Sequence, residues 1–259
     1  GRVTIKITGR EDQNGHGSAN LKGTDTIYLD VVSSKKNGWM QDSTGWWYRN
    51  ADGTYPVNKW QLINDKWYHF DRNGYMQTGW LRLGNTWYYL STDGSMVTDW
   101  QTIGGRKYYF MPSGAMSVGW RSVNGTYYYF ASSGAIMTGW VKSGSYWYYM
   151  DPSTGKMATG FVDIKGVTYY MNTSGAMVTG WFQLGSKWYY AAATGVVAKK
   201  GWVGNYYLEK DGVMVTYAYV KNGAKYYWIN SAGVYTQTYT EKDTAGYTIY
   251  DQTTGTKMN

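Results

Sequence analysis

The 259-residue chain contains no cysteine, only two histidines and only three prolines. Without thiols it can form neither a disulfide framework nor a thiolate metal site. No stretch of about 18 consecutive apolar residues occurs, which is the minimum for a helix that crosses a bilayer. The sequence therefore predicts neither a disulfide-stabilised domain nor a membrane span.

Groups suited to catalysis are scarce. His16 lies in a polar stretch, and His69 takes the place of a tyrosine in an aromatic strand. Aspartates beside turn glycines cap their own backbone; these are Asp52, Asp71, Asp93 and Asp151. We find no carboxylate pair of the kind a glycosidase needs and no metal-ligand spacing. We predict a protein that is not an enzyme and has neither metal nor cofactor.

Charged residues make up only 16% of the chain, and the net charge is +8. The basic residues are scattered, which is typical of a solvated surface that keeps an aromatic-rich protein soluble. The alternative is long-range attraction to a polyanion such as teichoic acid or an acidic glycan. No nucleic-acid fold signature accompanies the charge, so nucleic acid is not an expected partner.

What the chain has in abundance is aromatic side chains, with 15 tryptophans and 29 tyrosines. They follow a repeat of 20 or 21 residues, which we trace by one aromatic "anchor" per unit. The anchors are Trp39, Trp60, Trp80, Trp100, Trp120, Trp140, Phe161, Trp181 and Trp202. Units this short cannot bury an apolar face alone, so a constant period indicates a stacked array.

Each unit has the pattern of a β-hairpin. In the unit anchored at Trp120, the strand-like segments 119–123 and 126–130 flank Asn124-Gly125, a pair that tolerates the positive φ of a tight hairpin turn. Strand-forming aromatic and β-branched residues dominate, and no segment has a helical period. The fold class we predict is all-β, an elongated solenoid of stacked β-hairpin repeats.

The repeat does not cover the whole chain. Residues 1–35 alternate like strands and are predicted to be an N-terminal flank or cap, the tail of a preceding β-domain in a longer protein. Residues 36–259 are predicted to form the solenoid. Its unit at Trp202 is short, and tyrosines at Tyr219 and Tyr239 replace the tryptophan anchors, which indicates degenerate closing repeats.

A second aromatic residue follows most anchors after seven positions. A tight turn between them can place both rings on one side of a hairpin, and the next hairpin can add a third ring and a methionine. The predicted pairs are Trp39/Trp46, Trp60/Trp67, Trp80/Trp87, Trp120/Tyr127, Trp140/Trp147, Trp181/Trp188 and Tyr219/Tyr226, with third rings from Tyr88, Tyr108, Tyr148, Tyr169 and Tyr206.

Three rings around a small gap suit a quaternary ammonium group, which has a positive charge, no hydrogen-bond donor and an apolar skin. Cation–π attraction is worth about 0.5–2 kcal/mol per ring. The alternative is that the rings only fill space between hairpins. Two of the full-length units lack the second ring, because Lys107 follows Trp100 and Thr168 follows Phe161. We predict that their sites are absent or altered, since Lys107 would repel a cation.

The segments "TGWVKSGSYWYYMDPSTGKMATG" and "TGWFQLGSKWYY" closely resemble the choline-binding, or cell-wall-binding, repeats of Gram-positive surface proteins and lysins. The resemblance covers about residues 37–240. It implies that phosphocholine on teichoic or lipoteichoic acid is held between hairpins, so that a secreted protein is anchored at the bacterial cell surface. It also allows a homodimer through the C-terminal repeats.

Glucan-binding repeats resemble this chain more loosely, and they imply a second hypothesis, a module for α-glucan or a host glycan. Such a module would need polar side chains beside the rings, which Gln61, Gln101 and Gln183 could supply. The 20-residue units favour choline, because glucan-binding units are generally longer. A third hypothesis is an adhesion stalk with degenerate sites.

Overall fold

The structure, a computed structural model, describes residues 37–223 and 225–240. All regular elements in these ranges are β-strands, which confirms the predicted all-β class. The described ranges therefore contain no helix that could cross a membrane. The predicted N-terminal flank, residues 1–35, lies outside the described residues, as do residues 241–259.

Twenty-one short strands follow one another in the described ranges, and all but the last are consecutive hairpin partners. The first ten are β1 (Gly38–Gln41), β2 (Trp46–Arg49), β3 (Lys59–Ile63), β4 (Lys66–Phe70), β5 (Gly79–Leu83), β6 (Thr86–Leu90), β7 (Asp99–Ile103), β8 (Arg106–Phe110), β9 (Gly119–Val123) and β10 (Thr126–Phe130). The others are β11 (Gly139–Ser143), β12 (Tyr146–Met150), β13 (Gly160–Ile164), β14 (Val167–Met171), β15 (Gly180–Leu184), β16 (Lys187–Ala191), β17 (Gly201–Val203), β18 (Tyr206–Leu208), β19 (Ala218–Asn222), β20 (Lys225–Ile229) and β21 (Tyr235–Thr240).

The hairpin expected at Trp120 is present with the predicted bounds. Strands β9 and β10 pair antiparallel, with Trp120 opposite Tyr129. Between them Asn124 and Gly125 have φ values of 49° and 77°, so both turn residues occupy the left-handed region. Asparagine and glycine are the residues that tolerate this conformation best, which is why this dipeptide closes a two-residue hairpin.

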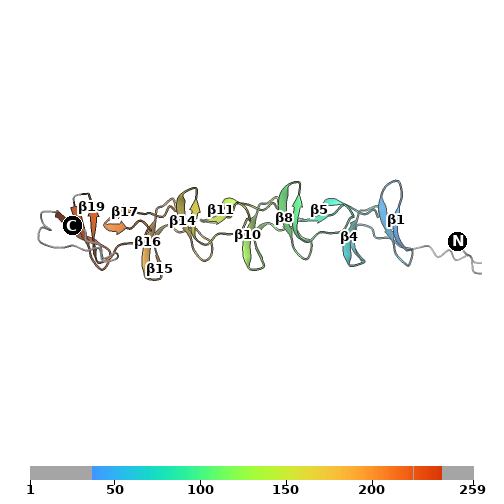
Figure 1. The fold of residues 1–259 in the computed structure, drawn as a ribbon. Coiled ribbons are helices and arrows are strands. Elements are labelled where there is room, and N and C mark those ends of the chain that lie inside the picture. The colour runs from blue at the N-terminus through green and yellow to red at the C-terminus, as the bar shows by residue number, and fades with distance from the viewer. Residues whose placement is uncertain (1–36, 224, 241–259) are drawn as a thin grey trace, which may run out of the picture.

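The hairpins stack into a long, narrow array (Figure 1). Successive hairpins point in different directions, and every third one points the same way. The hairpins containing β1, β8, β14 and β19 project to one side, and those containing β4, β10 and β15 project to the opposite side. This arrangement confirms the predicted elongated solenoid of stacked hairpins.

The core is a column of side chains at the end of the second strand of every hairpin after the first. Eight of the nine are completely buried and Phe130 is 1% exposed: Phe70, Leu90, Phe110, Phe130, Met150, Met171, Ala191, Leu208 and Ile229. Anchor indoles pack on this column from the preceding hairpin, as Trp39 does on Phe70 with ring centroids 5.9 Å apart. Each hairpin therefore buries its apolar face only against its neighbour.

Backbone hydrogen bonds also link neighbouring hairpins. The Met116 N–H donates to the Trp87 carbonyl oxygen at 2.8 Å, and the Met96 N–H donates to the Trp67 carbonyl oxygen at 2.7 Å. The methionine side chain then covers the glycine of the next turn. A Cβ built on Gly134, for example, would lie 2.2 Å from the Met116 sulfur. This close approach explains why glycine recurs in these turns.

One expectation for the C-terminal repeats is wrong. Tyr239 was predicted to be the anchor of a further repeat, but β21 pairs antiparallel with β20, placing Tyr239 opposite Tyr226. The strand joins the free edge of the β19–β20 hairpin and makes a three-stranded sheet, because pairing there satisfies the backbone groups of an otherwise open edge. The shortened Trp202 unit is confirmed, with strands of three residues each.

We expect Gly134→Ala to destabilise the array by about 1–3 kcal/mol, because alanine would be strained at φ 80° and its Cβ would overlap Met116. Chemical denaturation followed by tryptophan fluorescence measures the loss. Gly104→Asn is the matched control, since Gly104 has a positive φ with open space around it and Asn124 already occupies the same turn position. An equal loss in both variants would contradict the packing explanation.

Candidate functional site

The strand register places the anchor and the second ring on one face of each hairpin. In the β5–β6 hairpin, Trp80 lies opposite Tyr89 and Arg82 lies opposite Trp87, so both indoles point to the same side. Their ring centroids are 6.1 Å apart and the planes are nearly perpendicular, at 88°. Trp140 and Trp147 repeat this arrangement at 6.3 Å and 90°. The predicted same-face geometry is therefore present.

A tyrosine from the following hairpin completes the set. The Trp80 ring meets that of Tyr108 edge to face, with centroids 5.1 Å apart. The other predicted third rings contact their anchors at similar distances: Trp60–Tyr88 at 5.2 Å, Trp120–Tyr148 at 4.7 Å, Trp140–Tyr169 at 4.9 Å and Trp181–Tyr206 at 4.7 Å.

Sequence reasoning missed four equivalent third rings. They are Tyr68 against Trp39, Tyr128 against Trp100, Tyr189 against Phe161 and Tyr227 against Trp202, at centroid distances of 4.8, 4.9, 5.2 and 5.1 Å. These rings lie 25 to 29 residues after their anchors, which is the same range as in the predicted set. This spacing would have identified them.

The rings differ sharply in exposure. Four third rings are no more than 9% exposed and belong to the packed core, namely Tyr68, Tyr108, Tyr128 and Tyr189, and the other five are partly buried. The second rings are the opposite, because 38–50% of each remains exposed: Trp46, Trp67, Trp87, Tyr127, Trp147 and Trp188. An aromatic ring that stays half exposed at the same place in six units is a surface available to a ligand.

At the Trp120 unit these groups enclose a pocket of about 400 Å³. Its lining consists of Trp120, Tyr127, Tyr148 and Met157, with Thr173 and Ser174 at the edge. None of these six side chains carries a formal charge. We call this set of anchor, second ring, third ring and methionine a cage. Its aromatic faces attract a cation, and its apolar methionine accepts methyl groups.

The two full-length units that lack a second ring carry a lysine of the chain itself near that position. The Lys107 ammonium nitrogen lies 4.5 Å from the centroid of the Trp100 ring. The Lys199 ammonium donates a hydrogen bond of 2.9 Å to the Thr168 hydroxyl. In Figure 1 the hairpins of these units, which contain β8 and β14, project to the same side of the array.

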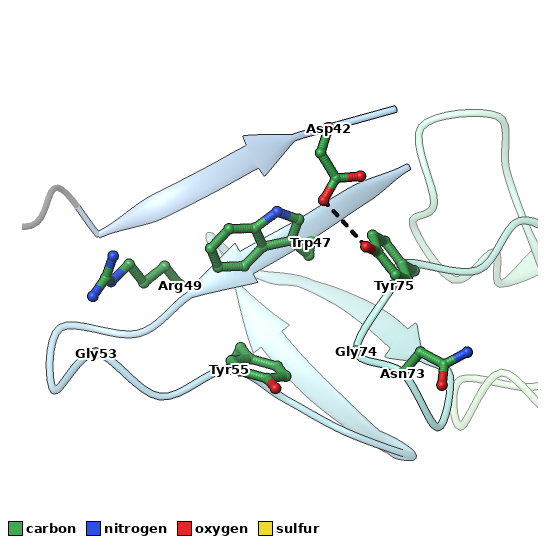
Figure 2. Close-up of a pocket in the computed structure, with 8 residues that line it drawn as sticks. All are labelled: Asp42, Trp47, Arg49, Gly53, Tyr55, Asn73, Gly74 and Tyr75. Carbon is green, nitrogen blue, oxygen red and sulfur yellow. Dashed lines mark hydrogen bonds between the residues drawn. The ribbon is translucent and has the colours of Figure 1, made fainter. Parts of the chain in front are cut away.

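A different pocket, of about 360 Å³, lies at the first described hairpin. Figure 2 shows Trp47 and Tyr55 facing it from one segment and Tyr75 from another, with Asp42 and Arg49 at its border. The Trp47 and Tyr55 ring centroids are 6.1 Å apart. Sequence reasoning missed this pocket, although Trp47 stands where other units have the third-ring tyrosine and Tyr55 stands where they have methionine.

The border of this pocket carries charged groups, unlike that of the Trp120 cage. The Tyr75 hydroxyl donates to an Asp42 carboxylate oxygen at 3.1 Å. Backbone N–H groups of Thr44 and Gly45, together with this hydroxyl, hold the pKa of the Asp42 carboxyl below its ordinary value. The first-hairpin pocket therefore combines aromatic faces with an ionised acceptor.

Several other polar groups singled out in the sequence are engaged by the protein, whereas Gln183 is exposed. The Gln61 and Gln101 side-chain amides donate to Asn50 Oδ1 and to the Thr98 carbonyl oxygen. His69 is 4% exposed and contacts Gln77 through Nδ1. Asp151 accepts from the Ser153 and Thr154 backbone. Within residues 37–223 and 225–240, no group of His, Asp and Glu side chains could hold a metal ion.

Comparison with known families gives a consistent result. A family described as the choline-binding repeat matches residues 57–99, 117–160 and 158–202. A second, described as the putative cell wall binding repeat, matches residues 98–116. Together the matches run without a break from residue 57 to residue 202, which is more than half of the chain.

Solved structures with the same fold include CbpJ from Streptococcus pneumoniae TIGR4, which is 35% identical with a TM-score of 0.63. The match covers 66% of this chain and 62% of that one. Choline binding protein F from Streptococcus pneumoniae is also 35% identical, with a TM-score of 0.61 over 66% of this chain and 61% of that one.

Among curated proteins, a lysin of Pneumococcus phage Dp-1 is 46% identical over 44 residues. This is 16% of the present chain and 15% of the lysin. A lysozyme of Streptococcus phage Cp-9 is 42% identical over 50 residues, or 18% of this chain and 15% of the lysozyme. The matched segments thus make up only a small part of each of these relatives.

We expect Trp147→Ala to weaken binding of a quaternary ammonium ligand at the Trp140 cage by about 2- to 30-fold, the range for loss of one cation–π contact. The indole is 41% exposed, so the fold should persist. Isothermal titration with choline measures the change. Tyr146→Ala is the control, because it removes a neighbouring ring that is 59% exposed and has no place in a cage. Equal weakening by both variants would remove Trp147 from the site.

Proposed function

The chain belongs to the family of choline-binding, or cell-wall-binding, repeat proteins, and from this membership we propose that residues 36–259 form a non-catalytic module that anchors a secreted bacterial protein to choline-bearing teichoic or lipoteichoic acid. Residues 1–35 would then be the flank that joins the module to a preceding domain. The complete cages carry the binding. Their anchors are Trp39, Trp60, Trp80, Trp120, Trp140 and Trp181.

The observation that supports this proposal most is the half-exposed second ring, which lies beside an anchor and a tyrosine of the next hairpin. Choline has a trimethylammonium group that suits such aromatic surfaces and needs no hydrogen-bond acceptor. Three rings supply on the order of a few kcal/mol, which corresponds to millimolar to micromolar affinity for each cage. A single cage is therefore a weak site.

Repetition converts weak sites into firm attachment. A polymer that carries many choline groups can occupy several cages of one array, and each further contact forms at a high effective concentration. The net charge of +8 adds long-range attraction to the phosphate groups of the same polymer. Both effects favour a location at the cell wall. A homodimer through the C-terminal repeats would add further cages to one assembly.

The side chains that could perform catalysis are used structurally, which supports a binding role. Asp71, Asp93 and Asp151 accept hydrogen bonds from the backbone of their own turns. His69 is buried against Trp60, with ring centroids 4.9 Å apart. None of these groups lines the pocket of the Trp120 cage. Any catalytic activity associated with the module would reside in another part of its parent protein.

A second candidate function, glycan binding, is favoured by the first-hairpin pocket. A sugar ring needs an aromatic face for its C–H groups and polar partners for its hydroxyls. Trp47 and Tyr55 offer the faces, and Asp42, Arg49 and Asn73 offer donors and acceptors. The cages themselves fit a sugar less well, because Gln61 and Gln101 already bond within the protein.

Tryptophan fluorescence during a choline titration tests the proposal. We expect a saturable change in the millimolar range or below, because the indoles form the walls of the cages. Sodium chloride at the same ionic strength controls for charge screening, and maltooligosaccharide is the competing ligand. A response to sugar alone, lost in Trp47→Ala, would favour the glycan-binding function. No response to either ligand would leave an adhesion stalk.

A further inference from the structure

The Trp100 unit has a pocket at the same place in the repeat as the Trp120 cage, but its lining has changed. Both pockets include the residue seven after the anchor, the side chain at the methionine position and two residues of a later turn. In the Trp120 cage these are Tyr127, Met157, Thr173 and Ser174. The anchor Trp100 does not line its own unit's pocket, whose volume is about 520 Å³.

In the Trp100 unit the equivalent residues are Lys107, Ile136, Ser153 and Thr154. Lys107 accounts for the altered shape. Its ammonium lies over the Trp100 ring at 4.5 Å, the distance at which a bound cation would be attracted. The chain thus supplies its own cation to the anchor. A quaternary ammonium ligand would have to displace the Lys107 ammonium from the Trp100 ring and would be repelled by its positive charge.

The remaining pocket has the character of an anion site. Arg106 and Lys107 contribute two positive charges, and no carboxylate is among its lining residues. Within the described part of the chain, the one ion pair joins Lys66 to Asp93 and involves neither of these residues. Hydroxyls of Ser133 and Ser153 add hydrogen-bond donors. Two cations with hydroxyl donors are suited to a phosphate group.

We propose that the Trp100 unit is a charge-inverted site, in which Lys107 occupies the aromatic cage as an internal cation and the adjoining pocket binds a phosphate group. The phosphate would belong to the polymer that fills the neighbouring cages, so this part of the inference rests on the proposed function. A single array would then contact both charges of a phosphocholine-bearing chain, with choline in the complete cages and phosphate beside Lys107.

The test uses the 259-residue chain with two probes, inorganic phosphate and choline. Phosphate is titrated against chloride at equal ionic strength and pH, and the Trp100 indole N–H resonance, assigned through Trp100→Phe, reports the site. We expect a saturable phosphate-specific shift. Phosphocholine should also shift this resonance, which would identify a polymer-type ester as a ligand, whereas a shift with inorganic phosphate alone would overturn the link to the polymer.

Lys107→Trp should convert the unit into a complete cage. We expect it to abolish the phosphate shift and to raise the choline stoichiometry, measured by calorimetry, by one site. Arg106→Gln should weaken phosphate about 2- to 5-fold, the range for loss of one exposed ion pair, and leave the choline stoichiometry unchanged. Lys187→Gln is the matched control, since Lys187 holds the same position in a complete unit, and it should change neither quantity at Trp100.

The outcomes separate this inference from the proposed function. Absence of choline binding in every unit of the unaltered chain would overturn the proposed function, while a phosphate shift at Trp100 would still support the anion pocket. Normal choline binding with no phosphate-specific shift would overturn the pocket. Circular dichroism would show whether Lys107→Trp folds. If the folded variant binds no additional choline, Lys107 is not the group that keeps choline out of the Trp100 unit.

Discussion

The contact of each anchor ring with the next hairpin is the interaction on which the whole array depends. A two-stranded hairpin is at best marginally stable in water, because it has no second layer to cover its apolar face. Trp80 provides that layer by packing against both Tyr108 and Phe110 of the following hairpin. The inter-hairpin hydrogen bond from Met116 to Trp87 fixes the spacing. Stability is therefore a sum of neighbour contacts, as in other repeat proteins.

The same packing produces the site. An anchor is held by the core on one side, and the gap it leaves on the other side is bounded by the third ring. The second ring makes no comparable contact, and Trp87 stays 38% exposed although it lies only 6.1 Å from Trp80. The proposed binding would thus use surface that folding leaves unfilled. Because the anchor serves both purposes, the second ring is the position where binding can be changed with least effect on folding.

That separation also explains how one unit can change its chemistry while keeping its fold. Replacement of the second ring by Lys107 leaves the Trp100 contacts with Tyr128 and Phe130 intact, at 4.9 and 5.8 Å. The Lys107 carbonyl oxygen still accepts the inter-hairpin hydrogen bond, from the Ile136 N–H. The backbone at this position is structural, and its side chain is free to vary. The charge of the side chain at this position can therefore differ between units of one continuous scaffold.

Much of this protein followed from its sequence alone, because the hairpins are local structures. The 20-residue period, the Asn124-Gly125 turn and the alternation along 119–123 determined the strands, the turn and the stacked architecture. The same-face pairing of Trp80 with Trp87 also followed from register. Tertiary structure decided what depends on the relation between units. It placed β21 on β20, revealed which rings stay exposed, formed the pocket of Trp47 and Tyr55, and set Lys107 over Trp100. The exposure and direction of a side chain depend on the particular residues of the neighbouring hairpin. A repeat pattern describes the average unit and not these individual contacts.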